Sequence, residues 1–203
     1  MLPLARRMVG DFTSLLAPFD LGELEVDASP ICGLRADLRV AYVNPAWVAF
    51  GVANGSPSME ASAALGTRIT DTVPEDPRPR FERLLERVRV TRQPAEHDYD
   101  CSTRTLRRTF RMRVHPCTAG GIVVVHSLYR EAPHTSVVEE ALDADYRNAR
   151  GMIVLCSNCR RSRRVATGEA QEELWDWVPR YALTPPEATS HGVCGPCAAD
   201  HYV

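Results

Sequence analysis

Four cysteines in two Cys-x-x-Cys pairs constrain this chain more than any other feature of its sequence. Cys156 pairs with Cys159 and Cys194 with Cys197, all in the last quarter of the 203 residues. Each pair forms a tight turn that presents two sulfurs to one ion, and two such turns complete a tetrahedral four-thiolate site that suits Zn²⁺. In a reducing compartment this pattern favours metal binding over disulfides. The sequence therefore predicts a zinc site at these four cysteines.

Residues 152–203 are expected to form a separate metal-binding module. Residues 160–193 separate the two pairs. This gap is longer than the roughly 15–20 residues of common zinc ribbons, so the insertion must hold structure of its own. Pro179 is placed to open a short helix, and the apolar residues around it are Leu174, Trp175, Trp177, Val178 and Tyr181. So small a module buries little surface, and metal would supply much of its folding free energy.

Two alternatives for the cysteine site remain open. Four cysteines also suit an iron–sulfur cluster, which would make the chain a redox or gas sensor. His191 lies three residues before Cys194. It is a candidate fifth ligand, or a substitute for one cysteine, but four cysteines already satisfy Zn²⁺ and we favour a hydrogen-bonding role inside the turn.

An arginine-rich run follows the first cysteine pair directly, and its members are Arg160, Arg161, Arg163 and Arg164. These side chains are placed to offset the negative charge of a four-thiolate zinc centre and to donate hydrogen bonds to sulfur. Alternatively, they contact the phosphates of a nucleic acid. Acidic residues nearby dilute the basic run, and they are Glu169, Glu172, Glu173 and Asp176. We therefore favour the charge-offsetting role, with nucleic-acid binding as the alternative.

Composition and charge argue against several other classes of protein. Apolar residues make up 44% and charged residues 25%, which is ordinary for a globular protein. The formal net charge of −2 argues against a chain-wide attraction to nucleic acid or to an acidic membrane. The longest apolar run, 120–126, is far shorter than the roughly 20 residues of a membrane span, and the N-terminus lacks a secretory signal pattern. We expect a soluble cytoplasmic protein with no membrane association.

The sequence also lacks the patterns of common enzymes. We find no Ser-His-Asp arrangement, no paired carboxylates in a recognisable context and no phosphate-cradling loop. A Cys-x-x-Cys oxidoreductase would need one reactive pair beside a βαβ unit, whereas two pairs in a small module indicate ligands. We therefore expect a protein that is not an enzyme.

Residues 29–132 show the pattern of a mixed domain of short helices and strands. Strands are predicted at 39–43, 96–101, 106–116 and 122–128. Within 106–116, Phe110, Met112 and Val114 alternate with polar residues, which is typical of a half-buried strand. Asn44-Pro45 and Asp76-Pro77 have the chemistry of helix starts. The helix after the second pair would bury Phe81, Leu84, Leu85 and Val88.

Two further helices are expected on either side of this domain. In the N-terminal segment, 1–28, the apolar residues Met8, Phe12, Leu15 and Phe19 have the spacing of one stripe on a helix over 3–19. A linker over 20–30 would follow. The stripe would either dock a second copy of the chain or pack on its own sheet. Residues 133–151 are predicted as a connecting helix that begins at Ser136, whose capping-box partner is Glu139, and ends at Gly151.

Residues 31–130 resemble a PAS domain in the order of their elements, which is two strands, short helices and three long strands. The best local matches are 41–47, Gly66 before 69–71, 99–112 and 121–125. The resemblance implies an α+β fold with a PAS-like five-stranded antiparallel sheet and flanking helices. With the cysteine pairs, the expected fold class adds a small zinc-ribbon-like module built on four cysteines. The resemblance also implies a sensor that acts through a signalling protein partner, with a homodimer as one option.

Some features of known PAS proteins are missing. The flavin-binding cysteine motif of light-sensing relatives is absent, and 78–92 holds no histidine for haem. The Asp-x-Thr motif that ends the last strand in many signalling PAS domains is replaced by 127–130. The ligand of a PAS pocket therefore stays unassigned. Other histidines and cysteines stand singly and are expected to be packed, half-buried or solvated: His97, His115, His126, Cys32, Cys101 and Cys117.

Residues 151–199 resemble a cysteine-rich extension that follows PAS or GAF regions in some bacterial sensor proteins. The matching parts are the apolar run 153–155, Cys156 to Arg161, a tryptophan at 175 or 177, and Ser-His-Gly-x-Cys-x-x-Cys over 190–197. The resemblance implies a metal-binding signalling appendage. Together, the two resemblances imply a stand-alone signalling sensor or adaptor in which a PAS domain is coupled to a structural zinc module.

Overall fold

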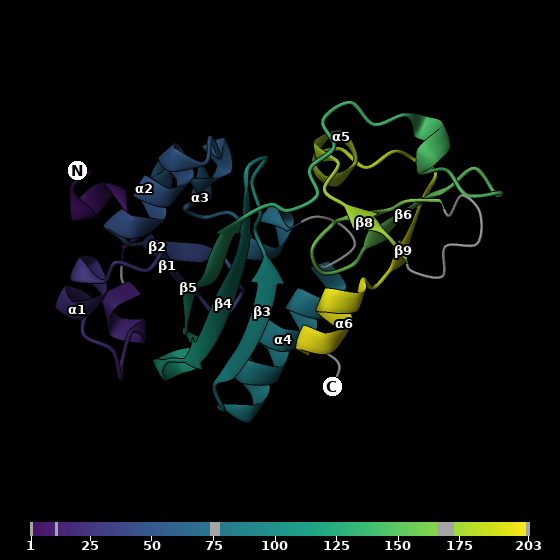
Figure 1. Ribbon diagram of the computed structural model, residues 1–203. Helices are drawn as coiled ribbons and strands as arrows, with labels where there is room; N and C mark the ends of the chain where they lie inside the picture. The colour runs from purple at the N-terminus through teal and green to yellow at the C-terminus, as the bar shows by residue number, and fades with distance from the viewer. Residues whose placement is uncertain (1, 11, 74–77, 166–172, 202–203) are drawn as a thin grey trace. The chain divides into compact units, whose positions relative to one another are not determined.

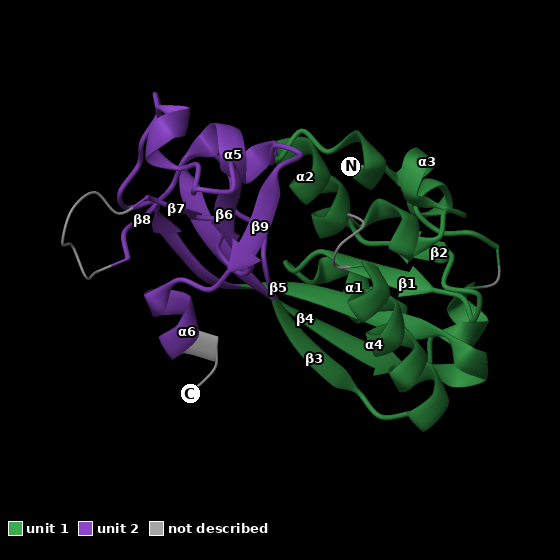
Figure 2. Ribbon diagram, turned by 90° about the vertical axis from the view of Figure 1, so that its right-hand side faces the viewer, with its two compact units in different colours: residues 1–98, 111–128 green, residues 99–110, 129–203 purple. Residues whose placement is uncertain are grey.

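The computed structural model describes residues 2–10, 12–73, 78–165 and 173–201. The chain divides into two compact units (Figure 2). Unit 1 comprises residues 1–98 and 111–128, and unit 2 comprises residues 99–110 and 129–203. Residues 99–110, which comprise the end of one strand, the turn after it and the start of the next strand, therefore belong to the same unit as the cysteine pairs.

A five-stranded sheet with the strand order β2-β1-β5-β4-β3 is the framework of the region that resembles a PAS domain (Figure 1). Its strands are β1 (Ile31–Leu34), β2 (Val40–Val43), β3 (Ala95–Asp100), β4 (Leu106–Pro116) and β5 (Ile122–Pro133). β1 runs antiparallel to both β2 and β5, with Cys32 opposite Val43 and Val124. The expected α+β fold with a PAS-like antiparallel sheet is confirmed, and its two edges are β2 and β3.

Helices and 3-10 turns connect β2 to β3. They are α2 (Pro45–Ala53), η3 (Pro57–Met59), α3 (Ala61–Ala64), η4 (Ile69–Thr72) and α4 (Arg78–Thr91). α4 buries Leu85 and Val88 and half-buries Phe81 and Leu84, as its spacing predicts. The expected helix start at Asp76-Pro77 lies outside the described residues. No helix in the described part of the chain combines the length and the apolar character needed to cross a bilayer.

Asn44 confirms the predicted helix start and does more than cap the helix. Its Oδ1 accepts the N–H of Trp47 at 2.9 Å, while Pro45 occupies the first turn of α2. The same oxygen accepts the N–H of Ile31 at 2.9 Å. Its amide nitrogen donates to three backbone carbonyls, those of Leu24, Asp27 and Ser29. One fully buried side chain thus joins β1, the start of α2 and the segment before β1.

β4 has the alternating burial that its sequence predicts. Phe110, Met112 and Val114 are buried, while the arginines between them are partly exposed. Arg111 pairs with Asp98 across the neighbouring strand at 2.8 Å. The polar face of the strand is therefore held by ion pairs and the apolar face by packing.

The predicted N-terminal helix over 3–19 is wrong. The segment forms the 3-10 turns η1 (Leu4–Arg6) and η2 (Phe12–Leu15), and the expected linker contains a short helix, α1 (Leu21–Val26). Gly10 with φ 49° and Pro18 interrupt helical geometry. Phe12 is fully buried against the sheet, and its ring occupies the space where a Cβ on Gly33 would lie 2.1 Å away. The apolar stripe therefore packs on its own sheet.

Backbone bonds also tie the N-terminal segment to the outer edge of β2. Val9 N–H donates to the carbonyl of Ala41 at 2.7 Å, and Val43 N–H donates to the carbonyl of Arg7 at 2.9 Å. The buried guanidinium of Arg7 pairs with Glu25 at 2.5 Å, and Glu25 also accepts the hydroxyl of Tyr42 at 2.7 Å. The hydrogen bond from Arg7 lowers the pKa of Glu25.

The cysteine-bearing region contains a four-stranded sheet with the order β8-β7-β6-β9. Its elements are β6 (Ile153–Cys156), β7 (Ser162–Arg163), β8 (Trp175–Asp176), α5 (Pro179–Leu183), β9 (Thr189–Gly192) and α6 (Gly195–His201). β6 and β9 are parallel, a detail that the expected ribbon-like module did not include. Pro179 opens α5 as predicted. The aromatic residues of the insertion, Trp175, Trp177 and Tyr181, are buried, whereas Leu174 is exposed.

The predicted connecting helix over 133–151 is wrong as well. All of these residues are described, and their helical structure is limited to the 3-10 turn η6 (Asp143–Asp145). Ser136 has φ 54° and does not cap a helix. Instead, Val138 N–H donates to the carbonyl of Trp177 at 2.9 Å, and Tyr146 packs in a buried cluster with Ile153. Tertiary contacts with the cysteine module override the local helix pattern.

Candidate metal centre

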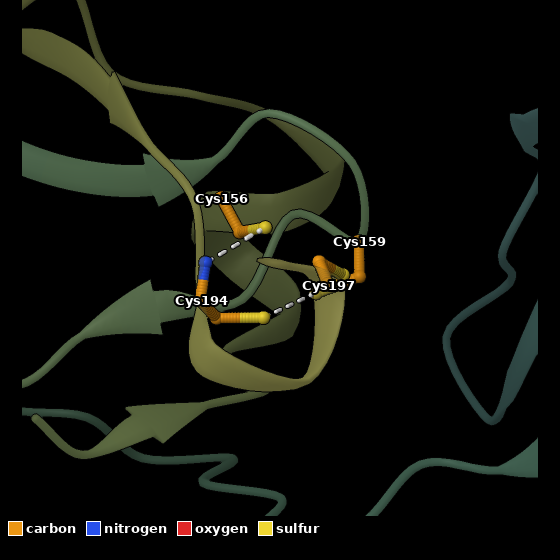
Figure 3. A group of neighbouring side chains, drawn as sticks. All are labelled: Cys156, Cys159, Cys194 and Cys197. Carbon is orange, nitrogen blue, oxygen red and sulfur yellow. Dashed lines mark hydrogen bonds between the residues drawn. The ribbon is translucent and has the colours of Figure 1, made fainter. Parts of the chain in front are cut away.

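The parallel strands β6 and β9 deliver the two cysteine pairs to one place. Cys156 ends β6 opposite Gly192, the last residue of β9, and Cys194 follows two residues later. Cys159 lies in the turn after β6, and Cys197 lies in α6. The four sulfur atoms lie within 4.8 Å of one another (Figure 3). The structure thus brings together all four cysteines that the sequence singles out.

The spacing of the sulfurs fits one tetrahedral ion. Zn–S bonds of about 2.3 Å place the sulfurs of a regular tetrahedron about 3.8 Å apart. The Sγ atoms of Cys159 and Cys194 are 3.6 Å apart. All four cysteines are reduced and buried, so they offer four soft ligands in a site shielded from water.

The crowded thiols do not ionise independently. Cys156 Sγ accepts the backbone N–H of Cys194 at 3.4 Å, as Figure 3 shows. Hydrogen bonds from Cys159 and Cys197 lower the pKa of Cys156 strongly, and the same pairing with Cys156 raises the pKa of Cys159 to about 12. The pKa of Cys197 is also raised, mainly through Cys156. A cation among the four sulfurs would favour their thiolate forms.

Arg107 is the residue near the sulfurs that the sequence did not point to. Its Nη2 lies 3.6 Å from Cys197 Sγ, and the contact joins residues 90 positions apart. Arg107 lies on β4, one of several arginines in that strand, and no spacing to the cysteine pairs marks it. Residues 99–110 fold into the same unit as the cysteine pairs, and this tertiary arrangement places Arg107 beside Cys197.

The arginine run after Cys159 makes other contacts. Its side-chain partners among the described residues are Ala182 for Arg160, Thr135 for Arg161, Glu173 for Arg163 and Asp176 for Arg164. These partners are oxygen atoms, so the expected hydrogen bonding of these side chains to sulfur is not what the structure describes. The backbone N–H of Arg161 does act on Cys159, where it favours the thiolate. Glu169 and Glu172 lie outside the described residues.

His191 does not join the cysteine group. It lies on β9 opposite Leu155 and is exposed. Among the described residues, the candidate ligand group consists of the four cysteines. The option of His191 as a fifth ligand is therefore not supported, and its hydrogen bonding inside the turn stays a prediction.

The single cysteines and histidines of unit 1 are packed side chains, as expected. Cys32 and Cys117 are buried, and burial raises the pKa of the Cys32 thiol to about 12. His126 lies beside the Trp47 ring, with ring centres 5.9 Å apart, and burial lowers its pKa to about 4. None of them belongs to a described metal-ligand group.

Comparison with solved structures finds chains with a similar fold. The chain is similar to the PAS domain of BvgS from Bordetella pertussis, with 21% identity, 54% of this chain and 82% of that chain covered, and a TM-score of 0.41. It is also similar to a domain of a sensory box sensor histidine kinase/response regulator from Geobacter sulfurreducens. That match has 19% identity, covers 52% of this chain and 88% of that chain, and has a TM-score of 0.35. No family model matches the chain. No curated protein matches it.

Proposed function

We propose that this chain is a signalling sensor or adaptor in which a PAS-like domain is coupled to a structural zinc module. The observation that carries the proposal is the group of four buried cysteine sulfurs within 4.8 Å of one another. The PAS-like sheet and its flanking helices support a sensing role for the other half of the chain. Cys156, Cys159, Cys194 and Cys197 would hold the ion.

The spacing of the sulfurs favours a single ion over an iron–sulfur cluster. In a cluster, the four cysteines are divided over two or four iron atoms, so cysteine sulfurs on different irons stand further apart than the edges of one tetrahedron. Here all four sulfurs lie within 4.8 Å of one another. The 3.6 Å separation of Cys159 and Cys194 sulfurs matches a shared ion. Thiolate ligands in a tetrahedral set then favour Zn²⁺ among common metals.

A closed site supports a structural rather than a catalytic metal. Catalytic zinc keeps an open position for water or substrate, whereas four protein thiolates fill the coordination of the ion. The four cysteines are at most 2% exposed, as expected of a closed structural site. We therefore propose that the chain is not an enzyme.

Protein contacts are the proposed output. Arg163 and Arg164 pair with Glu173 and Asp176, so their charges are offset within the module and are less available to phosphates. This favours a signalling protein partner over nucleic acid. Self-association stays a prediction. The N-terminal stripe packs on its own sheet, so a dimer would need another surface. Co-purification of two differently tagged copies tests it.

Metal analysis of the full chain tests the proposal. Protein purified without oxygen should contain about one zinc per chain and no acid-labile sulfide. Cobalt substitution should give the absorption of a tetrahedral four-thiolate site. A Cys156→Ser/Cys194→Ser variant should lose the metal, whereas Cys101→Ser, which changes a half-buried cysteine outside the group, should keep it. Several irons with sulfide would replace this proposal with a cluster-based redox or gas sensor.

A further inference from the structure

The turn between β3 and β4 is held by two other residues of unit 2, His134 and Trp177. The indole N–H of Trp177 donates to the carbonyl of Arg104 at 3.0 Å. His134 Nε2 lies 2.9 Å from the carbonyl oxygen of Thr103, and His134 N–H donates to the carbonyl of Thr105 at 3.2 Å. Three consecutive carbonyls of the turn therefore have partners in unit 2, which fixes the path of its backbone.

These partners form a rigid support. The rings of His134 and Trp177 stack with their centres 3.6 Å apart and an angle of 8° between their planes. Both side chains are buried, with His134 9% exposed and Trp177 1% exposed. Stacked and hydrogen-bonded rings have little rotational freedom, so the turn they hold is well placed to present a side chain at a defined position.

Arg107, the second residue of β4, comes directly after this turn and contacts the candidate metal centre. Its Nη2 lies 3.6 Å from Cys197 Sγ. Its charge also acts on Asp100, whose pKa is raised by burial while Ser102 and the charges of Arg107 and Arg160 oppose the rise. A four-thiolate zinc centre would carry a net negative charge beside Arg107, because two positive charges are set against four thiolates.

We propose that Arg107 is a positioning residue of the metal centre, and that its contact with Cys197 makes metal loading order the β3–β4 turn over residues 101–105. This inference rests on the proposed zinc site. A guanidinium near a zinc-bound thiolate offsets its charge and holds its orientation, as outer partners of metal ligands do elsewhere. Without the ion, nothing bonded to the Cys197 sulfur fixes its position, so its contact with Arg107 is held less firmly. The turn then loses one of its anchors and opens more often.

Zinc affinity in single-residue variants of the full chain tests the first half of the proposal. Competition with a chromophoric chelator should show that Arg107→Gln binds zinc about 10-fold to 100-fold more weakly than the wild type. Arg107→Lys, which keeps the charge but not the planar fork, should lie in between. Arg163→Gln is the matched control, because it removes the same charge from a residue that pairs with Glu173. Equal affinities for Arg107→Gln and Arg163→Gln would overturn the proposal.

Hydrogen exchange tests the second half in the wild-type chain, so it does not depend on any variant folding. The amides of Cys101 and Thr103 bond to the carbonyls of Arg108 and Leu106 at 2.9 and 2.8 Å. Their exchange should slow when zinc is added to metal-free protein. In Arg107→Gln at saturating zinc, the slowing should be smaller. If the wild type binds no zinc, the proposed function itself fails. If it binds zinc and these amides exchange at an unchanged rate, this inference fails and the zinc site stands.

Discussion

The two units of the chain are stabilised in different ways. The core of unit 1 is hydrocarbon, with Phe12, Ile31 and Val123 among its fully buried residues. In unit 2, four of the six buried residues around the metal centre are the cysteines themselves. Alternate residues of β6 belong to different clusters, because Ile153 and Leu155 pack in an apolar cluster while Cys156 packs with the other three cysteines. A sheet domain can rely on burial, whereas the proposed zinc site would supply part of the stability of a module with a core this small.

Removal of the metal should reveal the largest difference in stability between the two units. Structural zinc sites contribute apparent binding free energies of about 10–16 kcal/mol, which exceeds what so small a core supplies. We expect a chelator to abolish amide protection in β6 and β9 while the β1–β5 pairing stays protected. Hydrogen exchange with mass spectrometry measures both at once, and chelator already saturated with zinc is the control. Equal loss of amide protection in both units would show that they do not differ in their dependence on metal.

Replacement of Arg7 should weaken unit 1 and leave the metal centre intact. Arg7 is 2% exposed and its partner Glu25 is 22% exposed, so Arg7→Ala leaves a largely buried carboxylate with one hydroxyl partner. We expect a loss of about 3 kcal/mol in the unfolding free energy of unit 1. Denaturant titration measures this loss, with zinc content as the parallel readout. Arg89→Ala, which breaks an exposed ion pair with Glu86, should have a much smaller effect.

The same ion pair predicts how unit 1 responds to acid. The folded pKa of Glu25 lies below its usual value of 4.5, because Arg7 stabilises the carboxylate. The unfolded chain therefore takes up the proton at a higher pH than the folded chain. This contribution to stability is fully present above about pH 4.5 and is lost as the pH falls through the lower folded value. Exchange rates of β1 and β2 amides should show a shallower acid dependence in Arg7→Ala than in the wild type.

Asn44→Ala should have the smallest of these effects and should again be confined to unit 1. The change removes the cap of α2 and leaves buried N–H and carbonyl groups without a partner. We expect a loss of about 2 kcal/mol. Asn54→Ala is the control, since Asn54 lies at the other end of the same helix and its amide donates to the carbonyl of Phe50. A loss of zinc from Asn44→Ala would contradict the independence of the two units.

The sequence predicted elements whose signals are local. Asn44-Pro45 marks a helix start within a few residues, and the alternation of Phe110, Met112 and Val114 needs nothing beyond the strand itself. The cysteine site could also be predicted, because each pair is a local turn and metal chemistry requires the two pairs to meet. Side chains that act within their own turn or strand are therefore visible in one sequence.

Features set by distant contacts were missed. The helix predicted after Ser136 does not form, because this segment bonds instead to the cysteine module, as from Val138 N–H to the carbonyl of Trp177. The predicted N-terminal helix does not form either, and Phe12 packs over Gly33. Arg107 could not be identified, because its partner Cys197 lies 90 residues away and neighbouring arginines have the same local context. In each case a tertiary contact outweighs a propensity of a few tenths of a kcal/mol per residue.

The pairing of residues 7–9 with β2 has a consequence for how copies of this chain can meet. An open sheet edge is a template on which another chain can add a strand. Here the N–H of Val43 is already bonded to Arg7 and the carbonyl of Ala41 to Val9, so the chain occupies its own edge at these positions. A foreign strand would first have to displace this segment, along with the buried Arg7 that anchors it. Residues 7–9 thus oppose edge-to-edge pairing of β2 with another chain.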